Sequence, residues 1–279
     1  MPYKSIIMIL THSDASFAAL EAARDFAEKR DAHLDVLALG IDRSQAGFSY
    51  TEFSAALLEA GLEEARKTAT SLGKKANALL NKQSGRYATV PLVAPIGAVG
   101  QEIARYARFG DLAIMPLPYG DAAHSDDVNA LEAALFSANI PVLAVPGATK
   151  QIVAPKRIVF GWNESAEAMA AARSALPFLV EADTVFVTVI DPPQHGPDRS
   201  DPGGLVSQYL ARHGVRCEID VLSKSMHRVG DVLLRQVEDC DADMLVMGAY
   251  GRARWSEAMF GGATRQMLEF ASVPVLMAR

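Results

Sequence analysis

The chain has 279 residues, of which 50% are hydrophobic and 22% are charged, and its formal net charge is −6 at neutral pH. This composition is ordinary for globular proteins, and the length suits two domains of average size. The negative charge argues against broad binding to nucleic acids or to anionic membranes, so we expect neither as a partner.

The sequence has no recognisable targeting signal, and this, together with its two cysteines, favours a cytoplasmic protein. No apolar run reaches the ~18–20 residues of a membrane span. The apolar part of residues 1–10 is too short for a secretory signal and predicts a first β-strand instead. Cys217 and Cys240 lie in apolar surroundings without a CxxC spacing, which favours two buried, reduced thiols.

Apolar runs alternate with helical patterns along the whole chain. Strands are predicted at 6–10, 34–39, 90–94, 112–115 and 142–145, and again at 157–161, 184–190, 216–221, 244–247 and 273–277. Several runs are apolar throughout, as expected for strands buried on both faces of a parallel sheet. We therefore predict two tandem doubly wound α/β domains, each with a five-stranded, mostly parallel sheet in the order 3-2-1-4-5.

The two halves of the chain repeat one another. A strand, a polar turn and an Ala-rich helix occur in 9–24 and again in 158–173, which pairs Asp14 with Asn163. The difference in residue number between matched residues of the two halves is smaller at their ends than at their starts, so the first half has extra residues in between. We place these extra residues within 43–86, where the pattern of 51–80 predicts one or two helices. The Pro- and Gly-bounded join at 146–155 then separates domains at 1–148 and 155–279.

A glycine-rich segment, 248–264, follows the fourth strand of the second half and leads into a helix. Glycine lets a ligand approach the backbone closely, and a helix N-terminus favours negative charge. Such a segment predicts a phosphate site, although it has no Walker A spacing. The residues assigned to it are Met247, Gly248, Gly251, Arg252, Gly261, Gly262, Ala263 and Thr264.

Ligands of open α/β sheets bind outside the carboxyl ends of the strands, where the strand order reverses. Asn163 follows the first strand of the second half and Gly248 ends the fourth, so both converge on that crevice. Asn163 would bond a ribose or base edge, and Asp191, after the second strand, would add a polar contact. Spacing alone leaves open that the glycines only form tight turns and that Asn163 only caps a helix.

The motif resembles that of the universal stress protein family. Its ATP-binding members carry Gly-x-x-Gly, nine residues and then Gly-Ser/Thr, which Gly248, Gly251 and Gly261 match in spacing. The resemblance implies a tandem stress-response protein that binds ATP, ADP or AMP, with or without Mg²⁺, in its second domain. It also implies that the last strands pair the two domains as an intrachain pseudo-dimer, and it suggests a homodimer.

Three departures from the family pattern concern the site. Gly262 stands where the family has Ser or Thr, and Asn163 stands where it has Asp. In the first half, residues 116–119 (Pro-Leu-Pro-Tyr) replace the glycine turn, and proline lacks the N–H that an anion cradle needs. We therefore expect a degenerate first domain and one nucleotide site, in the second.

The sequence offers no clear catalytic residue and no metal site. Its six histidines lack metal-ligand spacing, and there is no G-x-S-x-G motif. The main hypothesis is nucleotide binding with little or no turnover, in which the loop 191–204 acts as a flap over the site. Two alternatives stay open: a slow ATPase or phosphoryl or nucleotidyl transferase, and an interaction module that has lost nucleotide binding.

Overall fold

The structure is a computed structural model that describes residues 2–11, 14–44, 55–81, 85–119, 124–147, 149, 151–192, 201–249 and 262–279. Contacts divide the chain into two compact units. The N-terminal unit comprises Tyr3–Val142 and Gly147–Ile152, and the C-terminal unit consists mainly of Val153–Arg279 and also takes in Leu143–Pro146.

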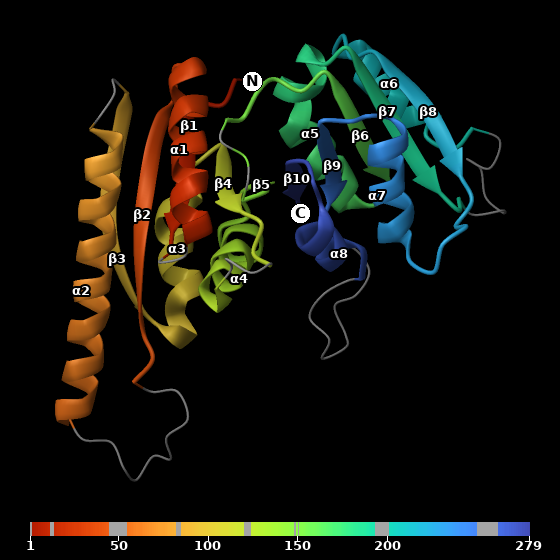
Figure 1. Ribbon diagram of the computed structural model, residues 1–279. Coiled ribbons are helices and arrows are strands. Elements are labelled where there is room, and N and C mark those ends of the chain that lie inside the picture. The colour runs from red at the N-terminus through yellow and green to blue at the C-terminus, as the bar shows by residue number, and fades with distance from the viewer. Residues whose placement is uncertain are drawn as a thin grey trace. The chain divides into compact units, whose positions relative to one another are not determined.

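Strands and helices alternate through the N-terminal half of the chain (Figure 1). Its strands follow the order β3-β2-β1-β4-β5, and β1 pairs in parallel with both β2 and β4. The elements are β1 (Ser5–Leu10), α1 (Asp14–Lys29), β2 (His33–Asp42), α2 (Ala55–Leu80), β3 (Arg86–Pro95), the 3₁₀ turn η1 (Ile96–Ala98), α3 (Val99–Ala107), β4 (Leu112–Pro116), α4 (Ser125–Glu132), the π-helical turn η2 (Ala133–Ala138) and β5 (Val142–Val145).

The C-terminal half repeats this arrangement with the strand order β8-β7-β6-β9-β10. Its central strand β6 pairs in parallel with β7 and β9. The elements are β6 (Arg157–Trp162), α5 (Ala166–Glu181), β7 (Thr184–Ile190), α6 (Gly204–Arg212), β8 (Cys217–Leu222), α7 (Val229–Asp239), β9 (Met244–Gly248), α8 (Gly262–Phe270) and β10 (Val275–Ala278).

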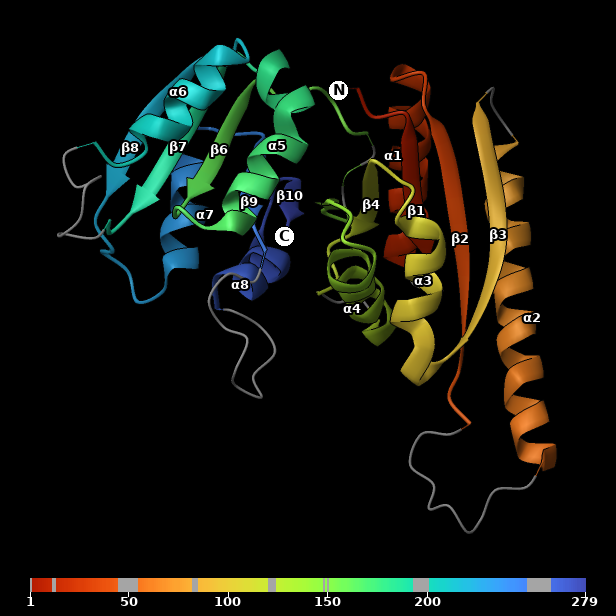
Figure 2. The same cartoon turned by 180° about the vertical axis from the view of Figure 1, so that it is seen from behind.

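Helices cover both faces of the strands in each half (Figures 1 and 2). In the N-terminal half, α1 and α2 lie on one face while α3 and α4 lie on the other. In the C-terminal half, α5 and α6 share one face while α7 and α8 share the other. Parallel strands between two helical layers define the doubly wound α/β class, so the predicted fold class and strand order are confirmed.

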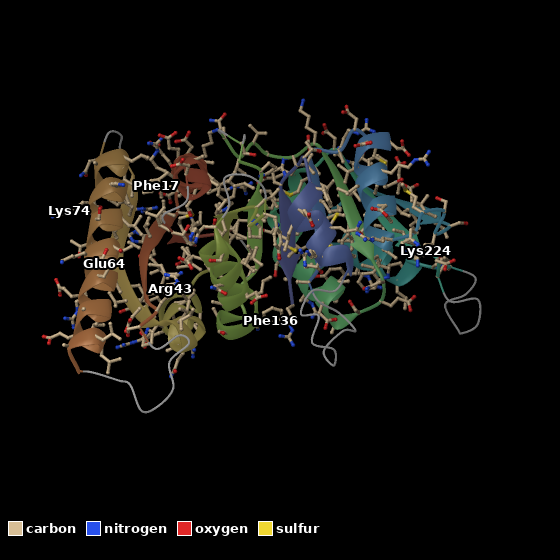
Figure 3. The ribbon with its side chains drawn as sticks, turned by 60° about the horizontal axis from the view of Figure 1, so that its bottom comes forward. Phe17, Arg43, Glu64, Lys74, Phe136 and Lys224 are labelled. Atoms are coloured by element: carbon tan, nitrogen blue, oxygen red, sulfur yellow. The ribbon has the colours of Figure 1, made fainter. Side chains whose placement is uncertain are left out.

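Helix α2 explains the difference in length between the halves. It has 26 residues, whereas its counterpart α6 has nine, so the extra residues lie where the sequence placed them. Ala65, Ala69 and Ala76 are buried against the sheet, and Lys74 is exposed (Figure 3). The contact is close, because a Cβ on Gly40 of β2 would lie 2.0 Å from the backbone oxygen of Ala65.

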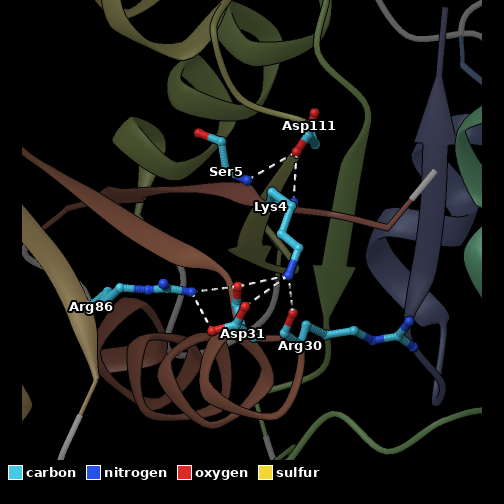
Figure 4. Close-up of polar contacts among 6 residues, drawn as sticks. All are labelled: Lys4, Ser5, Arg30, Asp31, Arg86 and Asp111. Carbon is cyan, nitrogen blue, oxygen red and sulfur yellow. Dashed lines mark hydrogen bonds and ion pairs between the residues drawn. The ribbon is translucent and has the colours of Figure 1, made fainter.

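The repeat extends to how the amino ends of the strands are joined. In the N-terminal unit, Asp111 Oδ2 accepts hydrogen bonds from the backbone N–H groups of Lys4 at 2.7 Å and Ser5 at 2.9 Å (Figure 4). In the C-terminal unit, the Asp243 carboxylate accepts from the N–H groups of Lys156, just before β6, at 3.0 Å and of Arg157, its first residue, at 3.2 Å. Each aspartate thus ties the start of the central strand to the start of its neighbour.

Asp31 forms a second connection at the same edge of the N-terminal unit. Its carboxylate accepts a hydrogen bond from Lys4 Nζ at 3.0 Å and another from Arg86 Nη2 (Figure 4). The hydrogen bond and charge of Lys4, together with the charge of Arg86, lower the pKa of Asp31 below its usual value. The stabilisation from this depressed pKa is present at neutral pH and is lost as the pH falls through the folded-state pKa.

We expect Asp31→Asn to lower the melting temperature slightly at pH 7 and to lose that effect in acid. As the pH falls below the ordinary aspartate pKa of about 3.9, the carboxyl is protonated first in the unfolded chain and then, at its lowered pKa, in the folded protein, so the wild type and the variant converge. Thermal unfolding from pH 7 to pH 3, at low and high salt, measures this, because salt screens exposed ion pairs. Glu21→Gln, at an exposed carboxylate on α1, is the control; an unchanged difference in acid would contradict the assignment.

The cysteines differ from the expectation that both are buried. Cys240 is buried, but Cys217 is only half-buried, because β8 lies at an edge of the strand order. No disulfide joins them. Burial raises the pKa of the Cys240 thiol. Over the described residues, no helix is both long enough and apolar enough to cross a membrane.

Candidate functional site

A cavity of about 250 Å³ lies at the carboxyl ends of the strands in the C-terminal unit. Its walls come from β6, β7 and β9, from the first two turns of α7 and from the first turn of α8. This is the point where the strand order reverses, and so where open α/β sheets bind ligands. The lining residues are Gly161, Trp162, Asn163, Thr188, Ile190, Val229, Leu233, Met247, Gly248 and Ala263.

Four of the residues predicted from the sequence line this cavity: Asn163, Met247, Gly248 and Ala263. Asn163 directly follows β6, Met247 and Gly248 end β9, and Ala263 is in the first turn of α8. Segments that are far apart in the sequence are therefore brought together at one crevice, as the topology predicted.

Three predicted residues do not line the cavity. Asp191 is exposed just beyond β7, where its φ of 50° turns the chain and its N–H donates to the Leu222 carbonyl at 2.8 Å. Thr264 is buried, with 4% of its surface exposed, and Gly262 begins α8 at the surface. These two share the first turn of the helix with Ala263, next to the cavity.

The remaining predicted residues, Gly251, Arg252 and Gly261, lie outside the described residues. Most of the predicted flap at 191–204 also lies outside them, since 193–200 are not described. The part that is described enters α6 at Gly204.

Asn163 holds the turn between β6 and α5. Its Oδ1 accepts from the backbone N–H of Ser165 at 3.2 Å, and Glu164 between them takes a left-handed φ of 60°. Ser165 is the N-cap of α5, because its Oγ accepts from the N–H of Ala168 at 3.1 Å. The helix cap is therefore Ser165, and the Asn163 amide group lies at the cavity.

Gly248 has a packing role that the sequence did not predict. It was expected to shape a turn, but it ends β9, and the described glycines with positive φ are Gly203 and Gly214. A Cβ on Gly248 would lie 2.5 Å from the backbone nitrogen of Ala168 and 2.7 Å from the carbonyl carbon of Glu167. Gly248 is thus needed for the close approach of the first turn of α5 to β9.

Most of the residues that line the cavity were not predicted from the sequence. Thr188 and Ile190 are two residues apart on β7 and face the same side, while Val229 and Leu233 are four apart on α7. Thr188 was the one usable signal, because it is a polar residue in the middle of an apolar run and is only 1% exposed. The other wall residues look like ordinary core positions in the sequence.

A polar contact holds α8 against α7 behind the cavity. Gln266 Nε2 donates to Asp231 Oδ1 at 2.6 Å, and both side chains lie near the starts of their helices. Gly230 permits this approach, because a Cβ there would lie 2.3 Å from Gln266 Oε1. The first turn of α8 is therefore fixed beside the cavity by residues that do not line it.

Strand registers show which residues of the N-terminal unit stand where residues of the C-terminal unit line the cavity. Gly161 pairs with Thr188 in the C-terminal unit, and the matching pair in the N-terminal unit is Ile9 with Leu37. Two large apolar side chains thus occupy the positions of a glycine and a threonine. Pro116 likewise ends β4 where Gly248 ends β9.

The same registers correct the pairing of Asp14 with Asn163. Asp14 begins α1, whereas Asn163 lies before α5, so the residue equivalent to Asn163 is Thr11. The first residues of α1 resemble in sequence the turn that follows β6. The sequence alignment of the two halves was therefore displaced by about one helical turn. Thr11 is buried, and its Oγ1 donates to Asp127 Oδ1 at 2.5 Å.

The fold and the site define a class: a protein of two doubly wound α/β units, one of which has a ligand-sized cavity at the strand-order reversal. Residues 155–279 match the model of the Universal stress protein family. This half of the chain belongs to that family, and the N-terminal half repeats its fold.

Known proteins agree with this assignment. The chain is 28% identical over 148 residues to the universal stress protein Slr1230 of Synechocystis, and the match spans about half of each protein (50% and 47%). A universal stress protein from Archaeoglobus fulgidus DSM 4304 has a TM-score of 0.68 at 15% identity, covering 97% of this chain and 96% of that one. A functionally unknown protein from Pseudomonas aeruginosa PAO1 has a TM-score of 0.55 at 16% identity, covering 98% and 92%. The two solved structures support the fold over the whole chain.

Proposed function

We propose that the C-terminal unit binds an adenine nucleotide, ATP, ADP or AMP, with little or no turnover, and that the protein acts as a stress-response regulator. The observation that carries the proposal is the cavity at the strand-order reversal, which Asn163, Met247, Gly248 and Ala263 line. Membership of residues 155–279 in the universal stress protein family supports it.

The cavity walls suit a purine base. Ile190, Leu233 and Met247 offer apolar surface, and a methionine sulfur makes favourable contacts with aromatic rings. Thr188 adds a hydroxyl whose bond to the Phe186 carbonyl is long, at 3.4 Å, so it can turn toward the edge of a base. A cavity of about 250 Å³ takes the base and leaves the rest of the nucleotide outside.

The ribose would then lie near the Asn163 amide, and the phosphates would extend over the first turn of α8. There Gly262, Ala263 and Thr264 form the first turn of the helix, and a helix N-terminus favours an anion. The proposal extends the phosphate site to Gly251, Arg252 and Gly261. Mg²⁺ would arrive bound to the phosphates; in the part of the chain that the structure describes, no three His, Cys, Asp or Glu side chains group as a metal site.

The N-terminal unit is proposed not to bind nucleotide. Asp126 and Asp127 at the start of α4 are buried, with 4% and 0% of their surfaces exposed, and carboxylates repel phosphate. The unit would serve instead as a partner for the C-terminal unit, in the pseudo-dimer that the family resemblance implies. Sedimentation of the whole chain, with and without nucleotide, would test the further proposal of a homodimer.

Calorimetric titration with ATP, ADP and AMP, each with and without Mg²⁺, tests the function. We expect one site per chain with a dissociation constant below about 1 mM. No heat of binding at millimolar nucleotide would contradict the proposal and favour an interaction module. Steady release of ADP above a protein-free control would favour a phosphotransfer enzyme instead.

Asn163→Ala should weaken nucleotide binding by roughly tenfold, the effect of one lost polar contact. Ser165→Ala is the matched control: it removes the cap of α5, at a cost of about 1 kcal/mol of stability, without touching the cavity. Titration and thermal unfolding of both variants separate the two roles. Equal affinities in Asn163→Ala and wild type would remove Asn163 from the site.

A further inference from the structure

A second cavity, of about 480 Å³, lies in the N-terminal unit and is separate from the nucleotide cavity. It is lined by the end of β2 and the residues just after it, by the N-terminal half of α2 and by the first turn of α4. Figure 3 labels Arg43, just beyond β2, and Glu64 on α2. The lining residues are Leu39, Ile41, Arg43, Ser44, Gly61, Glu64, Ala65, Thr68 and Asp126.

Charged groups of both signs face this cavity. Arg43 Nη2 pairs with the buried Asp126 carboxylate, while 43% of the Arg43 side chain stays exposed. A guanidinium has five N–H donors, so others remain for a ligand. Glu64 is exposed on α2, and its carboxylate forms no ion pair or hydrogen bond with the described residues, so it is a second, opposite charge at the same cavity.

The rest of the lining is apolar or carries hydroxyl groups. Leu39, Ile41 and Ala65 are buried and form an apolar wall. Ser44 Oγ is buried and has no hydrogen-bond partner among the described residues. A buried hydroxyl without a partner costs free energy, which a polar ligand in the cavity would recover.

We propose that this cavity binds an aliphatic α-amino acid in its zwitterionic form. The ligand carboxylate would take the remaining donors of Arg43, and the ligand ammonium would bind the Glu64 carboxylate. The aliphatic side chain would lie on Leu39, Ile41 and Ala65. A ligand that carries one charge of each sign satisfies both groups.

The lining disfavours the other ligand classes. A phosphate would meet the negative charges of Glu64 and Asp126. A third carboxylate, that of Asp42, lies close to the lining residue Gly61, since a Cβ built on Gly61 would be 2.6 Å from Asp42 Oδ1. A simple amine would satisfy Glu64 but meet the positive charge of Arg43. The cavity is therefore unsuited to the nucleotide proposed for the C-terminal unit.

Calorimetric titration of the full chain with L-leucine, leucinamide and N-acetyl-leucine tests this proposal. Leucinamide lacks the carboxylate, and N-acetyl-leucine lacks the ammonium group. We expect L-leucine to bind with a dissociation constant of at most about 10 mM, and each derivative to bind at least about tenfold more weakly. Binding of leucinamide as tight as that of leucine would show a cation site, and no binding of leucine would show that the cavity has no such ligand; either overturns the proposal.

Glu64→Gln should weaken leucine binding by about tenfold, since it removes the charge opposite the ammonium group. Glu63→Gln is the matched control, because Glu63 is an exposed neighbour on α2 that does not line the cavity. Both substitutions are at the surface, so both variants should fold; circular dichroism checks this. Equal leucine affinity in both variants would overturn the assignment of Glu64.

Discussion

Gly161→Val should weaken adenine nucleotide binding by at least about a hundredfold and leave the protein folded. Gly161 lies in β6 at the cavity, and a Cβ there would meet Leu233 at 3.4 Å and Met247 at 3.8 Å, which are ordinary contacts. The valine methyl groups would extend beyond that Cβ into the space assigned to the base. In the N-terminal unit the position in β1 that matches Gly161 is occupied by Ile9, so this fold accepts a β-branched side chain there.

Calorimetric titration measures the loss, and thermal unfolding checks the fold. Thr184→Val is the matched control, since it places a valine in the neighbouring strand β7, at the amino end and away from the cavity. Gly161→Ala should have an intermediate effect, because it adds only the Cβ. Wild-type affinity in a folded Gly161→Val protein would place the nucleotide elsewhere.

Gly248→Ala should destabilise the C-terminal unit by about 1–3 kcal/mol, the usual cost of overpacking. The added Cβ would meet the backbone of α5, at 2.5 Å from the Ala168 nitrogen, and backbone atoms cannot rotate out of the way. Either α5 moves from β9 or the strand end shifts. Since Gly248 also lines the cavity, nucleotide affinity should fall with the stability.

Chemical denaturation of the variant measures this loss. Gly262→Ala is the control, because no heavy atom lies within 4 Å of a Cβ built there and the residue is exposed. It should change the free energy of unfolding by much less than Gly248→Ala. Equal stability of the two variants would contradict the packing role assigned to Gly248.

Local sequence patterns were sufficient for the fold. All ten predicted strands are present, and most of their ends differ by only a few residues from those predicted. Apolar runs such as Val142–Val145 and Val275–Ala278 are buried along their whole length, as parallel strands between helical layers require. The repeat then indicated the same strand order in both halves, which the structure confirms.

The candidate site was predictable only in part. The turns after β6 and β9 could be placed at one crevice because carboxyl ends of parallel strands meet at one edge. The helix wall from Val229 and Leu233 could not, because apolar residues four apart on a helix look the same whether they face a core or a cavity. The pairing of Asp14 with Asn163 was wrong because two similar short sequence patterns lie about one helical turn apart in the first half. Only the strand registers show which of them matches the turn after β6.

By itself, the sequence determined the fold class, the duplication, the likeness of the second half to universal stress proteins and the half of the chain that carries the glycine motif. These depend on local periodicity and on short spacings, which a chain carries before it folds. Tertiary structure decided that Gly248 makes room for α5, that the buried Ile9 and Leu37 stand where Gly161 and Thr188 line the cavity, and that Arg43 and Glu64 face one cavity. Those facts depend on which side chains of distant segments meet, and packing alone settles that.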